Sequence, residues 1–205
     1  MKYSDLAPKA TVERTKTALQ QKGYEVIEVA SGTDALGLIT KTIPRGASIM
    51  NGTSTTLEQI GYLPYLREGN HEWRDLHALI TNENDKEKRT ALRRESTSAD
   101  FYLGSVHAVT ESGDLLIASN TGSQLSHLAF TSPNIILVVG THKIVPTLTD
   151  AMNRLEEYVL PLESERSIKA YGVPSQVNKI LLIKGENPML KRHIRIIFVN
   201  ERLGF

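Results

Sequence analysis

A continuous apolar run from Asn134 to Gly140 (N-I-I-L-V-V-G) constrains the fold of this chain more than any other segment. A strand with one face in water alternates apolar and polar side chains, whereas this run has no polar side chain after its first residue. The pattern is typical of a strand in the middle of a parallel sheet, buried on both faces. Because helical segments separate it from other apolar strands, we predict an α/β fold, with a mostly parallel sheet covered by helices on both faces.

The remaining segments are assigned from their periodicity and their turn residues. Helices are predicted over residues 8–22, 31–41, 57–61, 84–97, 124–130 and 146–158, and further strands over 24–30, 47–50, 99–103, 115–118, 179–184 and 194–199. The crossover from the strand at Leu115 to the helix after Pro146 predicts right-handed βαβ units. Residues 62–82 and 161–177 are expected to be irregular. No boundary divides the 205 residues, so we expect one domain over residues 1–205.

Composition excludes several classes of protein. The formal net charge is +1, which offers no electrostatic footprint for nucleic acid. The chain has no cysteine, so it supplies no disulfide, thiolate zinc ligand, cysteine nucleophile or iron–sulfur ligand. The segment His71–His77 lacks the spacing of a zinc-binding H-E-x-x-H motif, and we expect no metal and no cofactor. The start has no signal-peptide pattern, and the apolar runs are far below the ~20 residues of a membrane span. We therefore expect a cytoplasmic protein without a membrane partner.

Polar residues gather between apolar strands from Val109 to Leu128, and we place the functional site there. A tight turn contains Glu111 and Gly113. A second polar segment, at the start of a predicted helix, contains Asn120, Gly122, Ser123 and Gln124. These groups can bind an anion at a helix start, or they can simply cap the helix.

A second polar loop follows the strand predicted at 47–50. It reads Asn51, Gly52, Thr53, Ser54 and Thr55, and it precedes a helix. Backbone N–H groups and hydroxyls in such a loop can bind a phosphate or another anion. The alternative is that a hydroxyl only caps its own helix.

Three basic side chains complete the candidate site. Lys143 lies between a central strand and a helix, at the edge where ligands gather in open α/β sheets. It can neutralise a phosphate or carboxylate, or it can be an ordinary surface lysine. His107 and His142 are available as acid–base groups near pH 7, although lone histidines beside strands are more often structural.

The order of these motifs resembles the LUD domain family of lactate-utilisation proteins (LutC/YkgG-like). The resemblance rests on N-G-T-S-T-T-L-E-Q-I-G (51–61), A-D-F-Y-L-G-S-V-H-A-V-T-E-S-G-D-L-L (99–116), N-T-G-S-Q-L (120–125), I-L-V-V-G-T-H-K-I-V-P-T-L (136–148) and R-I-I-F-V-N-E-R-L-G-F (195–205). It covers nearly the whole chain. It implies a NagB/RpiA/CoA transferase-like fold. The turn Thr110-Glu111-Ser112-Gly113 is similar to the turn that carries the nucleophilic glutamate of CoA transferases, with Ser112 in place of an asparagine.

The resemblance implies a role in lactate or organic-acid metabolism, as the non-redox member of a system with iron–sulfur oxidoreductase subunits. The ligand expected at the 51–56, 110–113 and 120–124 segments is a small anionic metabolite, namely a phosphate, a CoA ester or a carboxylate. The turn between the last two strands departs from the LutC-like pattern, because it reads Lys184-Gly185-Glu186-Asn187-Pro188. Lactate itself is therefore less strongly implied, and a homo-oligomer is compatible with the fold.

Two other functions stay open. One is a stand-alone isomerase or acyl-CoA hydrolase or transferase, in which Glu111 attacks a thioester and nearby N–H groups hold the oxyanion. The other is a non-catalytic interaction module that uses residues 62–77, with Trp73 as its anchor.

Overall fold

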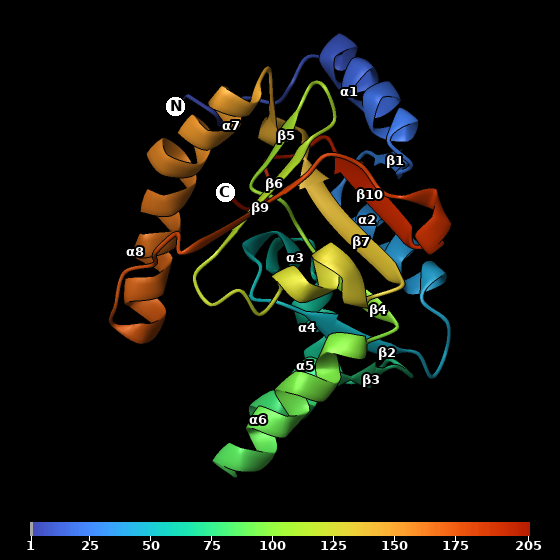
Figure 1. The fold of residues 1–205 in the computed structure, drawn as a ribbon, viewed down its shortest axis with the longest axis vertical. Coiled ribbons are helices and arrows are strands. Elements are labelled where there is room, and N and C mark those ends of the chain that lie inside the picture. Colours follow the sequence, from blue (N-terminus) through green and yellow to red (C-terminus); the bar gives the residue numbers. More distant parts are fainter. Residues whose placement is uncertain (1) are drawn as a thin grey trace.

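The computed structural model describes residues 2–205 and arranges the strands in two sheets (Figure 1). The main sheet has six strands in the order β1-β10-β7-β4-β2-β3, and every neighbouring pair is parallel. These strands are β1 (Glu25–Val29), β2 (Ser48–Asn51), β3 (Arg74–Asp75), β4 (Phe101–Gly104), β7 (Asn134–Gly140) and β10 (His193–Val199). The predicted α/β fold with a mostly parallel sheet is confirmed, and β7 has the bounds of the apolar run.

Strand β7 is buried on both faces, as its sequence predicts. Ile135, Leu137 and Val139 pack into one apolar cluster, and Ile136 and Val138 pack into another on the opposite face. This alternation follows from the two-residue period of a strand. Burial of each such side chain stabilises the fold by roughly 1.5–3 kcal/mol, which fixes β7 in the centre of the sheet.

The helices cover the main sheet and extend from it. They are α1 (Lys9–Gln21), α2 (Gly32–Thr42), α3 (Thr55–Gln59), α4 (Tyr62–Glu68), α5 (Leu76–Asn82), α6 (Lys86–Glu95), α7 (Leu148–Arg154) and α8 (Leu160–Tyr171). Short 3-10 turns are η1 (Ser96–Ser98), η3 (Thr141–Lys143) and η5 (Pro188–Leu190), and π-helical turns are η2 (His127–Thr131) and η4 (Leu155–Val159). Helices α2, α3 and α4 contribute to the cluster on one face of the main sheet, and α1 packs on the other.

The second sheet has the order β8-β5-β6-β9 and mixed directions. Its strands are β5 (Ala108–Thr110), β6 (Leu115–Ser119), β8 (Ile144–Val145) and β9 (Lys179–Ile183). One of its faces packs with α1 against the main sheet, and the other packs against α7 and η4. Figure 1 shows α7 and α8 running along the flank of this sheet.

The second sheet corrects two expectations. Strand β6 pairs with β5 and β9 rather than with β7, so the expected crossover from Leu115 does not form a βαβ unit within one sheet. The sequence also suggests that the strand at 99–103 begins the central hairpin, but this strand belongs to the main sheet, as β4, and the hairpin consists of β5 and β6 alone. Both errors have one cause: a fully buried strand has the same apolar pattern in either sheet.

Two segments expected to be irregular are helical. In residues 62–82, Gly61 and Gly69 adopt positive φ at the two ends of α4, and the Asp75 side chain caps α5 by accepting from Ala78 N at 2.9 Å. In residues 161–177, α8 continues to Tyr171 in spite of Pro161. The proline is the second residue of α8, just after the π-helical turn η4, where the α-helical hydrogen-bond ladder is already interrupted, so it does not end the helix.

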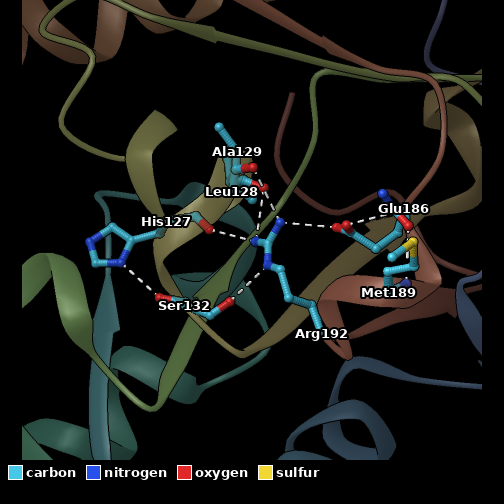
Figure 2. Close-up of polar contacts among 8 residues, drawn as sticks. His127, Leu128, Ala129, Ser132, Glu186, Met189 and Arg192 are labelled. Carbon is cyan, nitrogen blue, oxygen red and sulfur yellow. Dashed lines mark hydrogen bonds and ion pairs between the residues drawn. The ribbon is translucent and has the colours of Figure 1, made fainter.

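Arg192, in the loop before β10, is hydrogen-bonded to the end of the π-helical turn η2 (Figure 2). Its guanidinium donates to the carbonyl oxygens of His127, Leu128, Ala129 and Ser132 and pairs with Glu186 at 2.9 Å. These five contacts use all five N–H donors of an arginine. The Arg192 side chain is only 5 % exposed and that of Glu186 9 %, so this is a buried ion pair with a complete set of partners.

Candidate functional site

A cavity of about 240 Å³ lies beyond the carboxyl ends of β2 and β4, between the main sheet and the second sheet. Its lining comes from the loops after β2, β4 and β6, from η3, η4 and α8, from the loop before β9, and from the last residues of the chain. Ligands of open α/β sheets gather at the carboxyl ends of the strands, so this position agrees with the predicted site.

Most of the predicted ligand-binding residues line this cavity. They are Gly52, Thr53, Ser54, Thr55, Asn120, Ser123, Gln124 and Lys143. The two polar loops, which are far apart in the sequence, meet because the Gln124 side chain lies beside Gly52 and its Nε2 donates to Ala118 O at 2.9 Å. Ser54 also has the structural role named as the alternative, since its hydroxyl caps α3 by accepting from Leu57 N at 3.3 Å.

Four residues of the predicted polar loops do not line the cavity. Asn51 is buried and donates from Nδ2 to Gly52 O at 3.2 Å. Gly122 lies in the same loop as Asn120 but makes a left-handed turn at φ +85°. Gly113, at φ +82°, packs against α1, where an added Cβ would lie 3.1 Å from the Leu19 nitrogen.

The fourth of these residues, Glu111, lies at the far end of the β5–β6 hairpin. The cavity meets this hairpin at Ser119, and β6 separates the two ends by roughly 13 Å, given a strand rise of about 3.3 Å per residue. The Glu111 carboxylate instead pairs with Arg14 of α1 at 2.9 Å. The expected grouping of residues 110–113 with the other two loops is therefore not found, and a catalytic role for Glu111 stays a prediction.

Lys143 is the most unusual group in the cavity wall, because its side chain is buried without a carboxylate partner among residues 2–205. Its Nζ donates to Thr56 Oγ1 at 3.0 Å, to Ser105 Oγ at 3.1 Å and to Val106 O at 3.2 Å. Three acceptors match the three hydrogens of an ammonium group. Burial, and then the nearby Arg154 charge, lower the pKa of Lys143 well below its usual value, whereas the three acceptors favour the ammonium form and a bound anion would favour it further.

The two hydroxyls that contact Lys143 have their own hydrogens directed elsewhere. Thr56 Oγ1 donates to Leu203 O at 3.2 Å, and Ser105 Oγ donates to Val138 O at 2.7 Å. Both oxygens therefore present lone pairs to the ammonium group. The arrangement satisfies hydrogen bonding at Nζ but leaves its charge without a neutralising partner.

His107 also lines the cavity, as a neutral ring. Its Nδ1 accepts from Ala118 N at 3.0 Å, so the ring proton is on Nε2. Burial, followed by the Lys143 and Arg154 charges, lowers the pKa of His107 to about 3. His142 lies outside the cavity lining, and neither of its buried ring nitrogens has a partner among residues 2–205. His107 can donate to a ligand at pH 7 but cannot act as an ordinary acid–base group.

Arg154 lies behind this wall and is fully buried. One of its terminal nitrogens donates to His107 O, while Nε and Nη2 have no hydrogen-bond partner among residues 2–205 and the guanidinium lies over the Tyr158 ring, 5.2 Å from its centroid. Burial lowers the pKa of Arg154 to about 10, so it remains charged at pH 7. Two buried cations thus lie on one side of the cavity, and no acidic side chain among the described residues pairs with either of them.

Several residues of the lining were not predicted from the sequence. Ser105 follows a predicted strand at the edge of the sheet, so its position signalled the site. Gly204 and Phe205 gave no signal, because the C-terminal segment reaches the cavity only through the fold. Gly204 has φ +68°, and an added Cβ would lie 2.3 Å from Thr56 Oγ1 and 3.1 Å from Lys143 Nζ. The close approach of the chain to Lys143 therefore requires glycine.

The other sequence expectations concern metal, membrane and Trp73. No group of three or more potential metal-binding side chains occurs among residues 2–205. Within the same range, no helix has the length and apolar character to cross a membrane. Trp73 is half-buried, donates from Nε1 to Ile43 O at 3.2 Å and stacks on His71, so its ring is already occupied within the fold.

Comparisons with known proteins agree with this architecture. No curated protein matches the chain. A crystal structure of a DUF162 family protein from Deinococcus radiodurans superposes with a TM-score of 0.57 at 13 % identity, covering 96 % of this chain and 100 % of that one. At this identity the likeness shows the fold alone. A match to eIF2B beta from Chaetomium thermophilum, at 15 % identity over 68 % of this chain and 44 % of that one, has a TM-score of 0.30 and supports no conclusion.

The family itself is shown by sequence. The model of the LUD domain matches residues 12–199, which include every strand of both sheets and all but the last residues of the cavity wall. The resemblance inferred from the five sequence motifs is confirmed, and this chain belongs to the LUD domain family.

Proposed function

We propose that this LUD protein binds a small organic anion in the cavity, with Lys143 as the cation that holds it. The observation that carries the proposal is the buried Lys143 ammonium, which faces the cavity and has only neutral partners among residues 2–205. A charge removed from water without a counter-ion costs several kcal/mol, and a bound anion offsets that cost. An oxygen of the bound anion would replace one of the neutral acceptors of Lys143. The new hydrogen bond would be charge-assisted and therefore stronger.

The size of the cavity bears on the ligand class. Pockets that enclose drug-sized ligands are usually about 300–1,000 Å³, and this cavity is about 240 Å³. A carboxylate or a small phosphate ester fits within it, whereas a CoA ester would have only its acyl end enclosed. The ligand we propose is therefore a small organic anion, such as a metabolite of the lactate class.

In metabolism, we place the protein as the non-redox member of a multi-component organic-acid system. The absence of cysteine from the sequence supports this placement, because iron–sulfur clusters are ordinarily held by thiolates. Affinity purification from cells that express iron–sulfur oxidoreductase subunits should recover those subunits with the protein. Turnover of an organic acid by the purified chain alone would contradict the placement.

The binding proposal is tested by calorimetry and thermal unfolding with acetate, lactate and inorganic phosphate. An anion at 100 times its dissociation constant should stabilise the wild type by about 2.7 kcal/mol. Lys143→Met should remove this stabilisation, and the matched control Lys169→Met, which changes an exposed lysine of α8, should retain it. Equal stabilisation of Lys143→Met and wild type would overturn the proposal.

A further inference from the structure

The cavity changes in chemical character along its length. Its inner end, formed by Thr56, Ser105 and Lys143, is polar and cationic. Its outer wall, formed by Leu155, Val159, Leu160 and Val177, is apolar. Thr56 and Lys143 are each 2 % exposed, whereas Leu160 and Val177 of the outer wall are half-buried.

Two contacts between distant segments bring the residues of the outer wall to the cavity. Arg154 donates to His107 O, which brings the start of η4 beside the residues that follow Ser105. Ser119 pairs with Lys179 in the second sheet, which brings Val177 beside the loop after β6. The π-helical turn η4 directs both Leu155 and Val159 at the cavity, and such turns frequently occur at functional sites.

The charges of the lining fit a ligand with one negative group. Lys143 is the one cationic side chain in the lining, and no arginine contributes to it. The one acidic side chain of the lining is Glu163, whose carboxylate already pairs with Arg166 at 2.6 and 2.8 Å. A second anionic group on the ligand would find hydroxyl and amide groups in the lining but no second cationic side chain.

The cavity is partly open to solvent, so its volume limits how much of a ligand is enclosed rather than the length of the ligand. A water molecule occupies about 30 Å³ of liquid, so 240 Å³ corresponds to about eight groups of that size. A carboxylate with three to five further carbon atoms has six to eight non-hydrogen atoms, on the order of what the cavity holds.

We propose that the cavity selects short, straight-chain monocarboxylates of about four to six carbons. The carboxylate lies at the inner end, against Lys143 and the hydroxyls of Thr56 and Ser105, and the alkyl chain lies along the outer wall. This proposal rests on the proposed function, because it takes Lys143 as the anion-binding group.

The test is a calorimetric series from acetate to octanoate on the full chain. Each added methylene should tighten binding about three- to fourfold as far as hexanoate, because burying one methylene contributes about 0.8 kcal/mol. Octanoate should gain nothing further. Adipate, which is hexanoate with a second carboxylate, should bind at least tenfold more weakly than hexanoate.

Variants of the outer wall locate the alkyl chain. Val159→Thr and Val177→Thr keep the side-chain shape and introduce a hydroxyl, so the ratio of hexanoate to acetate affinity should fall severalfold. Val177 is in a loop and half-buried, so its variant serves if Val159→Thr does not fold. Val173→Thr, at a residue 58 % exposed, is the matched control and should leave the ratio unchanged.

The outcomes separate this proposal from the one on which it rests. If every chain length binds equally and Lys143→Met abolishes binding, the alkyl site is wrong and the anion site stands. If adipate or inorganic phosphate bound more strongly than hexanoate, the proposed preference for a monocarboxylate would also be wrong. If no carboxylate and no phosphate binds, both proposals fail.

Discussion

Two buried cations, Arg192 and Lys143, have opposite surroundings in the same molecule. The Arg192 guanidinium pairs with the Glu186 carboxylate and donates to four carbonyl oxygens, so its charge and all its donors are satisfied (Figure 2). The Lys143 ammonium has three neutral acceptors, no carboxylate among residues 2–205, and a cavity beside it. Burial alone therefore does not assign a role to a charged side chain. The role of a buried charge depends on its partners. A charge that is neutralised stabilises a loop, whereas a charge that is not neutralised is available to a ligand.

The largest expected effect is a difference in sign between substitutions of these two cations. Arg192→Met should lower the free energy of unfolding by about 3–5 kcal/mol, because Glu186 would remain buried and unpaired. Lys143→Met should leave the free energy of unfolding of the ligand-free protein unchanged or raise it by about 1 kcal/mol or more, because it removes a buried charge without a counter-ion. Urea unfolding at pH 7 measures both. Arg45→Met, at an ion pair whose arginine is 80 % exposed, is the control and should change little.

If Lys143→Met lowered the free energy of unfolding as much as Arg192→Met does, the two buried cations would no longer differ in their role. It would mean that the contacts to Thr56, Ser105 and Val106 hold the fold together, as the contacts of Arg192 do.

The next effect concerns acid. The His127 ring stacks on Tyr102 and contacts Ser132, and burial lowers the pKa of His127 to about 4. Below pH 6.5 the unfolded chain takes up a proton that the folded ring does not, so stability falls as the pH falls from 6.5 to about 4. Between pH 7 and pH 5 this loss is about 2 kcal/mol, given 1.36 kcal/mol per pH unit. His127→Asn should therefore lose about 2 kcal/mol less than wild type over this range, as measured by urea unfolding.

The control for the acid experiment is His193→Asn, because the His193 side chain is exposed. If the free energy of unfolding of wild type and of His127→Asn depended on pH in the same way, the His127 ring would not be held in its neutral form.

A smaller effect tests the geometry around Lys143. Gly204→Ala places a Cβ against Thr56 Oγ1 and Lys143 Nζ, so acetate or lactate affinity should fall about tenfold, or roughly 1.4 kcal/mol. Gly172→Ala is matched, because Gly172 also has positive φ (+76°) but no atom lies within 4 Å of an added Cβ. The Gly172→Ala variant should show the strain of alanine at positive φ but keep the anion affinity of the wild type. Equal affinities of the two variants would mean that Gly204 does not position the lysine.

The smallest expected effect is that of Glu111→Gln. The carboxylate pairs with Arg14, whose side chain is 59 % exposed, and it does not line the cavity. Anion affinity should therefore be unchanged, and the change in stability should be at most a few tenths of a kcal/mol. A large loss of affinity, or of any turnover that the chain proves to have, would restore Glu111 to the site and extend the site beyond the cavity.

The parts of the fold that were predictable depend on local signals. Strand β7 has the bounds of its apolar run, and Ser31 begins α2 with the capping box that Asp34 completes. The two polar loops and Lys143 were placed at the cavity correctly because each follows a strand, and strand ends of a parallel sheet meet at one edge.

What could not be predicted depends on contacts between distant residues. Nothing in Leu115–Ser119 shows that its neighbours are β5 and β9, and the position of Glu111 follows from which end of that hairpin meets the sheet edge. The burial of Lys143 is equally non-local, since it needs Thr56, Val106 and the C-terminal residues around Gly204 to surround one amine.

The position of β10 in the main sheet has a consequence for how the chain folds during synthesis. Strand β1 has β10 as its one neighbour in the sheet, and the paired residues Glu25 and Arg195 are 170 positions apart. A nascent chain emerging from the ribosome cannot complete the sheet, or bring Gly204 to Lys143, until these late residues have left the exit tunnel. Such long-range pairing is slow and leaves strand edges exposed meanwhile. The apolar edges of β1 and β7 should therefore be the main sites of chaperone binding while the protein is being made.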